Sequence, residues 1–76
     1  MNVSNEELLI DIKNTQDECL AYGKISDGYY ILSQLPENQG IKQREYLEKF
    51  IYFSNLYKDC NDFLMSLLAI KEDRNL

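Results

Sequence analysis

The sequence predicts an all-α fold: a small three- or four-helix bundle with a long carboxy-terminal helix. Three observations predict it. Residues 41–76 contain no Gly and no Pro, apolar and aromatic side chains recur there at helical spacing, and a helix-capping pattern opens the chain. With 76 residues, the chain is expected to form one helical domain over residues 1–76.

The first helix is predicted to run from about Ser4 to Tyr22. Ser4 followed by Glu7 fits a capping box, in which each side chain satisfies a backbone N–H of the first turn. Gly23 stands where a left-handed C-cap is expected. The apolar residues of this segment fall within about 120° of helical arc; they are Leu8, Leu9, Ile12, Cys19 and Leu20. This segment is therefore expected to be amphipathic.

A second, shorter helix is predicted from Gly28 to about Leu35, capped by Ser26–Asp27. Pro36 should end it, because the residue before a proline is pushed out of the helical region. Residues 37–40 are then a loop. An extended reading of residues 29–32 as a strand is an alternative, but a single strand has no partner in this chain, so helix is favoured.

The third helix is predicted to begin near Ile41 and to run to about Lys71. Uninterrupted, it would be roughly 45 Å long. A break near Ser54–Asn55 or Lys58–Asp59 would instead give a four-helix unit. Part of the segment follows an a/d heptad for nearly three repeats: Phe50, Phe53, Tyr57, Cys60, Leu64 and Leu67. Three repeats of mixed aromatic residues do not make a coiled coil, and a bundle is the better interpretation.

The apolar surface of this third helix covers an arc of roughly 200°, about twice that of an ordinary surface helix. It is formed by Tyr46, Leu47, Phe50, Phe53, Leu56, Tyr57, Cys60, Phe63, Leu64, Leu67 and Leu68. One neighbouring helix cannot bury such an arc. The helix is therefore expected either to pack centrally or to share its surface with a second chain, as a protein partner or as a homodimer.

The charge of the chain argues against direct binding to nucleic acid or to an anionic membrane, both of which require a basic face. The net charge is −5, and all of the excess lies in residues 1–40, because residues 41–76 hold six charges of each sign. No apolar run approaches the roughly 20 residues of a membrane span, and the first residues lack the pattern of a secretion signal. A cytoplasmic location is expected.

No catalytic, metal-binding or cofactor-binding pattern is present, so the chain is expected not to be an enzyme. The chain has no histidine, which removes the commonest general base and most zinc sites. Cys19 and Cys60 both fall on apolar arcs, where thiols are typically buried, reduced and inert. The three glycines are too far apart to form a phosphate loop.

An acidic stripe on the first helix is the first candidate interaction surface. Glu7, Asp11 and Glu18 fall within about 40° of one another on a helical wheel. Simple solvation of these carboxylates is the plainer interpretation. The sharper one is nucleic-acid mimicry, in which a row of fixed negative charges occupies the basic groove of a nuclease or transcriptional regulator. Some small phage proteins block host proteins in this way.

Three apolar residues that fall outside the apolar arcs are the second candidate: Ile10, Ile51 and Tyr52. Exposed residues of this kind mark a contact surface only where they cluster. Tyr is favoured at interfaces because it offers a large area with little loss of side-chain entropy. Together with the acidic stripe, these residues are the predicted partner-binding set.

The leading hypothesis is a non-enzymatic interaction module that binds and modulates, by inhibition, a protein partner. Nucleic-acid mimicry is the alternative. The abundance of Asn, Ile, Lys and Tyr is typical of AT-rich coding sequences, and small acidic helical proteins are common in phages and mobile elements of low-GC bacteria. An origin of that kind is the expectation.

Overall fold

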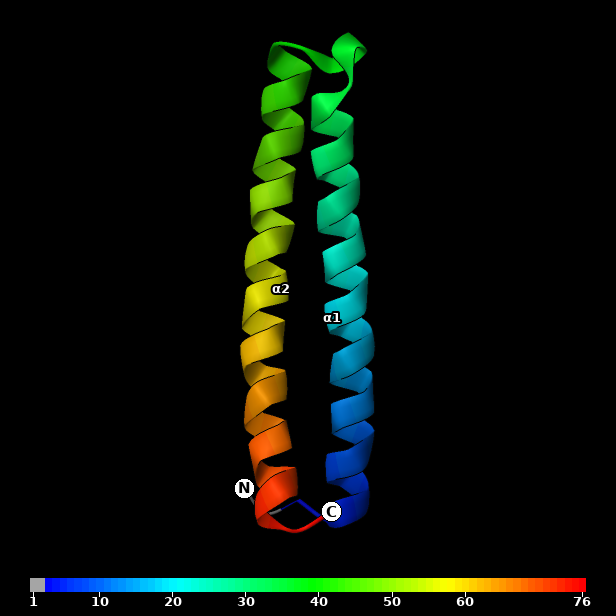
Figure 1. Ribbon diagram of the computed structural model, residues 1–76, viewed down its shortest axis with the longest axis vertical. Helices are drawn as coiled ribbons and strands as arrows, with labels where there is room; N and C mark the ends of the chain where they lie inside the picture. Colours follow the sequence, from blue (N-terminus) through cyan, green and yellow to red (C-terminus); the bar gives the residue numbers. More distant parts are fainter. Residues whose placement is uncertain (1–2) are drawn as a thin grey trace.

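The computed structural model, which describes residues 3–76, is a hairpin of two long antiparallel helices (Figure 1). Helix α1 spans Asn5–Gln34, a 3-10 turn η1 spans Pro36–Asn38, and helix α2 spans Ile41–Asp73. The described residues contain no strand. The all-α prediction is confirmed, whereas the predicted three- or four-helix bundle is wrong.

The bundle prediction fails because α1 does not end at Gly23. The helix continues through Gly23 and Gly28 to Gln34, so the separate helix predicted for residues 28–35 and the alternative strand at 29–32 are both absent from the described chain. A glycine inside a helix costs about 1 kcal/mol, and packing against α2 outweighs this cost. The residues that face α2 keep helical spacing across both glycines: Cys19, Tyr22, Ser26, Tyr29 and Ser33.

The predicted start of the first helix at Ser4 and the predicted helix end before Pro36 are confirmed. Ser4 caps α1, and its hydroxyl oxygen accepts a hydrogen bond from the backbone N–H of Glu7 at 3.1 Å. At the other end Leu35 is extended (φ −71°, ψ 137°) ahead of Pro36, as the steric effect of proline requires. Gly40 then turns the chain into α2 with φ +82° and ψ −127°, a conformation open almost only to glycine.

Helix α2 is continuous from Ile41 to Asp73, with no break at Ser54–Asn55 or Lys58–Asp59. Of the two alternatives that the sequence left open, the straight helix is correct. Its partner along the whole length is α1, and the short turn η1 joins the two at one end of the rod (Figure 1).

The buried apolar core lies toward the open end of the hairpin. Leu8 and Ile12 of α1 pack with Leu67 of α2, and all three are buried. Arg74 holds the same end together, because its Nη1 donates to the backbone oxygen of Val3 at 2.7 Å and to Oδ1 of Asn5 at 3.1 Å. Toward the turn, the helix contact is made by aromatic and small polar side chains instead.

The hairpin is a thin rod that leaves much apolar surface in solvent. It measures 51 × 14 × 14 Å, and its radius of gyration is 16.7 Å, against about 11 Å for a compact domain of this length. Large hydrophobic side chains that stand exposed include Leu9, Leu20, Ile25, Ile31, Ile41, Ile51, Tyr52, Tyr57, Phe63 and Met65. Two helices alone cannot enclose the apolar side chains that this chain carries.

Candidate interaction surfaces

The hairpin has two long sides, each made from one flank of α1 and one flank of α2. We call them the groove face and the acidic–aromatic face. The groove face contains Leu20, Asp27 and Tyr57, which line a hollow between the helices. The acidic–aromatic face contains the stacked rings of Tyr29 and Phe53. The two faces differ in the side chains that they carry, since both are built from the same two helices.

The groove has a volume of about 640 Å³ and lies at the middle of the rod. Small residues make its floor. A Cβ added to Gly23 would lie 3.4 Å from two carbons of the Tyr57 ring, so this ring packs directly on the α1 backbone. Ser26 and Ser54 continue the floor toward the turn. The hollow exists because these positions carry too little side chain to fill it.

Polar atoms on the groove floor already have partners inside the hairpin. The hydroxyl oxygens of Ser26 and Ser54 are 2.7 Å apart, and Ser26 Oγ also donates to the backbone oxygen of Phe50 at 3.4 Å. The walls are mainly apolar, formed by Leu20, Tyr57 and other side chains. The groove therefore offers a ligand apolar contact rather than hydrogen-bonding groups.

A second, shallower hollow extends the groove toward the turn. It is lined by Asp27, Tyr30, Ile31 and Phe50, and the rings of Tyr30 and Phe50 meet edge to face at 5.2 Å. Asp27 and Phe50 line both hollows. The two hollows together form one continuous, mainly apolar groove that extends from Gln16 to Ile31 on α1.

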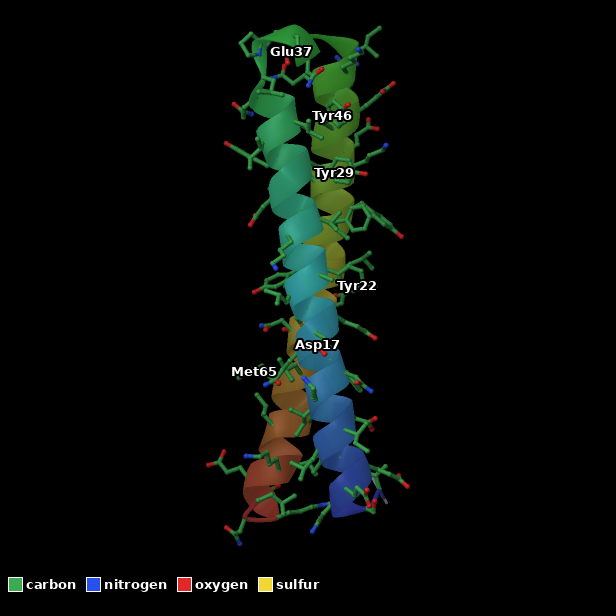
Figure 2. The ribbon with its side chains drawn as sticks, turned by 90° about the vertical axis from the view of Figure 1, so that its right-hand side faces the viewer. Asp17, Tyr22, Tyr29, Glu37, Tyr46 and Met65 are labelled. Atoms are coloured by element: carbon green, nitrogen blue, oxygen red, sulfur yellow. The ribbon has the colours of Figure 1, made fainter. Side chains whose placement is uncertain are left out.

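The opposite side carries a ladder of aromatic rings. Tyr29 stacks on Tyr46 with ring centroids 6.1 Å apart and on Phe53 at 5.7 Å, and Tyr22 meets Phe53 at 6.4 Å. The Lys49 ammonium lies 5.4 Å from the centroid of the Tyr29 ring, within cation–π range. Figure 2 shows Tyr22, Tyr29 and Tyr46 along one edge of the rod, with Met65 at the other.

The predicted acidic stripe lies on this same side. Glu7, Asp11 and Glu18 are all exposed on α1, and helical spacing places them within about 40° of the direction of Tyr29. They are on the order of 180° from Leu20 and Asp27, which line the groove. The stripe is therefore separated from the groove by the width of the helix.

Four of the six predicted partner-binding residues thus share one face: Glu7, Asp11, Glu18 and Tyr52. The Tyr52 ring stands edge-on to Phe53 at 5.2 Å and remains 61% exposed. The structure does not bring Ile10 and Ile51 to them. Ile10 is exposed on the outer side of α1, and Ile51 points about 100° away from Tyr52 around α2.

Two residues of the predicted apolar arcs, Leu20 and Phe63, are exposed. Leu20 belonged to the predicted apolar arc of the first helix, but it is 58% exposed on the groove rim. Phe63 belonged to the arc of the long helix, and it is 51% exposed. Helical spacing places Phe63 in line with Leu56 and Tyr52, on the acidic–aromatic face. The signal for Phe63 was already present, because an apolar arc of roughly 200° is wider than one neighbouring helix can cover.

The two thiols lie on facing helices near the middle of the rod. Both are free; Cys19 is buried and Cys60 is half-buried. Burial, a hydrogen bond with Cys19 and the proximity of Cys19 and Glu18 together raise the pKa of the Cys60 thiol to about 11. The Cys60 thiol also donates to the backbone oxygen of Thr15 at 3.6 Å. A thiol in this state is a poor nucleophile at neutral pH.

Residues 3–76 contain no group of three or more side chains placed to hold a metal ion. In the same part of the chain, neither helix is long and apolar enough to cross a membrane. Comparisons with protein-family models, with curated proteins and with solved structures give no match to this chain.

Proposed function

We propose that this protein is a non-enzymatic interaction module that binds a protein partner through its acidic–aromatic face and inhibits it. One observation carries the proposal. Tyr52 and Phe63 are exposed on the same face as Glu7, Asp11 and Glu18. Apolar anchors beside charged groups are typical of protein interfaces, where a few aromatic residues supply most of the affinity.

The chemistry of this face defines the partner that fits it. A basic surface with an apolar depression would meet both the carboxylates and the two rings. The carboxylates would steer the encounter and orient the partner, and the rings would slow dissociation. Because the face is built on two continuous helices, little backbone entropy is lost when it binds.

The proposal is tested by capturing the partner from the native host and then measuring its affinity for purified variants. Tyr52→Ala and Phe63→Ala are each expected to weaken binding at least tenfold, since truncation of an aromatic anchor typically costs 2 kcal/mol or more. Ile10→Ala is the matched control, because Ile10 is equally exposed but lies away from this face. Equal effects of all three substitutions would contradict the proposal.

Nucleic-acid mimicry is the second candidate function. It is favoured by the continuity of α1, which holds Glu7, Asp11 and Glu18 on one straight element. The target would then be the basic groove of a nuclease or transcriptional regulator. This mechanism assigns the affinity to the carboxylates, and the aromatic rings would contribute little.

Charge reversal distinguishes the two functions. Mimicry predicts that the triple variant Glu7→Lys, Asp11→Lys and Glu18→Lys abolishes binding and that wild-type affinity falls steeply with salt. The aromatic interface predicts a slower association and a modest loss of affinity. A control triple variant at Glu37, Asp62 and Glu72 changes the net charge equally, but at exposed positions outside the stripe.

A further inference from the structure

We infer that the groove face is covered by the groove face of a second copy of this chain, giving a two-fold dimer of hairpins with four helices. This surface is distinct from the acidic–aromatic face, so the inference stands whether or not the proposed function is correct. It rests on three observations: the area that the hairpin exposes, the distribution of its charge, and the shape of the groove.

The solvent-accessible area of the hairpin exceeds that of a compact monomer by about the area that one partner buries in a stable complex. The surface of the hairpin is 5668 Å² for a mass of 9.0 kDa, whereas a compact monomer of this mass exposes about 4,900 Å². The excess of about 800 Å² equals the area that one partner buries in a standard stable complex. Burial of that area against a second copy would therefore bring the exposed area per chain to that of a compact monomer of the same mass.

One long side of the rod is large enough to bury this area. The rod is 51 Å long and 14 Å wide, so a side has about 700 Å² in flat projection, and side-chain relief adds to the accessible area. The four-helix product is the usual architecture for helices that cannot cover their apolar faces in pairs.

Charge selects the groove face rather than the opposite one. A two-fold axis pairs a surface with itself, so a face with a net charge repels its own copy. The acidic–aromatic face carries Glu7, Asp11 and Glu18 against Lys49, so it is net negative and would do so. The groove is lined by one charge of each sign, Lys24 and Asp27, which are less than one turn apart on α1. Two-fold pairing allows each to approach the opposite charge of the other copy.

The shape of the groove fits a helix of the second copy. Ser26 and Ser54 make a floor that side chains can enter, and the Tyr57 ring packs on Gly23 beside it. Leu20 and Ile31 project beside this floor on α1, and both are exposed. Each copy thus supplies both the protruding residues and the hollow that receives them, as packing of ridges into grooves requires.

The test is sedimentation equilibrium of the full chain and of two matched variants. Wild-type protein should have twice the mass of one chain, 9.0 kDa, at micromolar concentration. Leu20→Glu should weaken the dimer at least a hundredfold, whereas Ile10→Glu should leave it unchanged. Both substitutions place a carboxylate on the surface of α1, since Leu20 is 58% and Ile10 is 52% exposed.

A photoreactive phenylalanine analogue at position 20 or at position 10 gives a second readout, which does not depend on the folding of Leu20→Glu. Irradiation should form covalent dimers from position 20 and none from position 10. The inference is overturned by a monomer at several hundred micromolar, by a dimer that Leu20→Glu does not weaken, or by equal cross-linking from both positions. A larger assembly would also overturn it, because two-fold pairing through one face closes at two copies.

Discussion

Ser26 and Ser54 meet across the hairpin, with their hydroxyl oxygens 2.7 Å apart. Because Ser26 Oγ donates to the backbone oxygen of Phe50, the Ser54 hydroxyl supplies the proton between the two side chains. The pair lies where a purely apolar seam would place larger side chains. It therefore joins α1 to α2 by a side-chain hydrogen bond at the floor of the groove.

Removing one hydroxyl of this pair should destabilise the hairpin. Ser26→Ala is expected to lower the free energy of unfolding by about 1 kcal/mol, because it leaves the buried part of the Ser54 hydroxyl without its partner. The double variant Ser26→Ala, Ser54→Ala should cost less than the sum of the two single variants, since it removes both polar groups together. Urea unfolding of the four proteins measures this coupling, and strict additivity would show that the hydrogen bond contributes nothing.

Gly28 should be replaceable by alanine with a gain in stability. It lies inside α1, and a Cβ added there meets no atom within 4 Å. Alanine is favoured over glycine in a helix by about 1 kcal/mol, so Gly28→Ala should raise the free energy of unfolding by about that amount. Ala21→Gly, at another exposed position of α1, should lower it equally. A loss of stability in Gly28→Ala would mean that the helix breaks at this position.

Gly40 should not tolerate the same change. Its φ of +82° with ψ −127° is strained for any residue with a Cβ, and Gly40→Ala should cost about 1–3 kcal/mol. Gln39→Ala is the control, because Gln39 is exposed and has ordinary extended angles. Thermal unfolding of the two variants compares them directly. Equal melting temperatures would contradict the turn geometry.

Cys60 should react slowly with alkylating reagents in the folded protein. Burial and the proximity of Cys19 and Glu18 raise the pKa of its thiol from 9.0 to about 11, so the thiolate fraction at pH 8 falls about a hundredfold relative to the unfolded chain. The alkylation rate should keep rising with pH until the pH approaches 11, rather than levelling off near 9. Iodoacetamide labelling of folded and urea-unfolded protein, followed by peptide mass spectrometry, measures both rates. Similar rates at pH 8 would exclude the raised pKa.

Local signals in the sequence were sufficient for the start of α1 at Ser4, for its end before Pro36 and for the class of the fold. Ser4 and Pro36 act through their immediate neighbours, one by capping and one by steric exclusion, so their effects are visible without tertiary structure. The absence of Gly and Pro from residues 41–76 permitted one long helix but did not exclude a break, and the continuity of α2 was settled only by the structure.

The number of helices could not be predicted, because it depends on contacts between segments far apart in the chain. Gly23 has the local signature of a helix end, yet it lies mid-helix beneath the Tyr57 ring. Ser26 has the signature of a cap, yet its hydroxyl bonds to α2. In both cases tertiary packing overrides local propensity. Leu20, on the predicted apolar arc of the first helix, is 58% exposed because the described chain has no third helix to cover it.

Both surfaces depend on the continuity of α1, because only one unbroken helix leaves apolar side chains uncovered on both long sides of the hairpin. Backbone chemical shifts across residues 5–34 test it most directly. The structure predicts unbroken helical ¹³Cα shifts through Gly23 and Gly28, ending at Gln34. Non-helical shifts over residues 23–27, with a new helix beginning near Gly28, would restore the three-helix bundle and contradict the account.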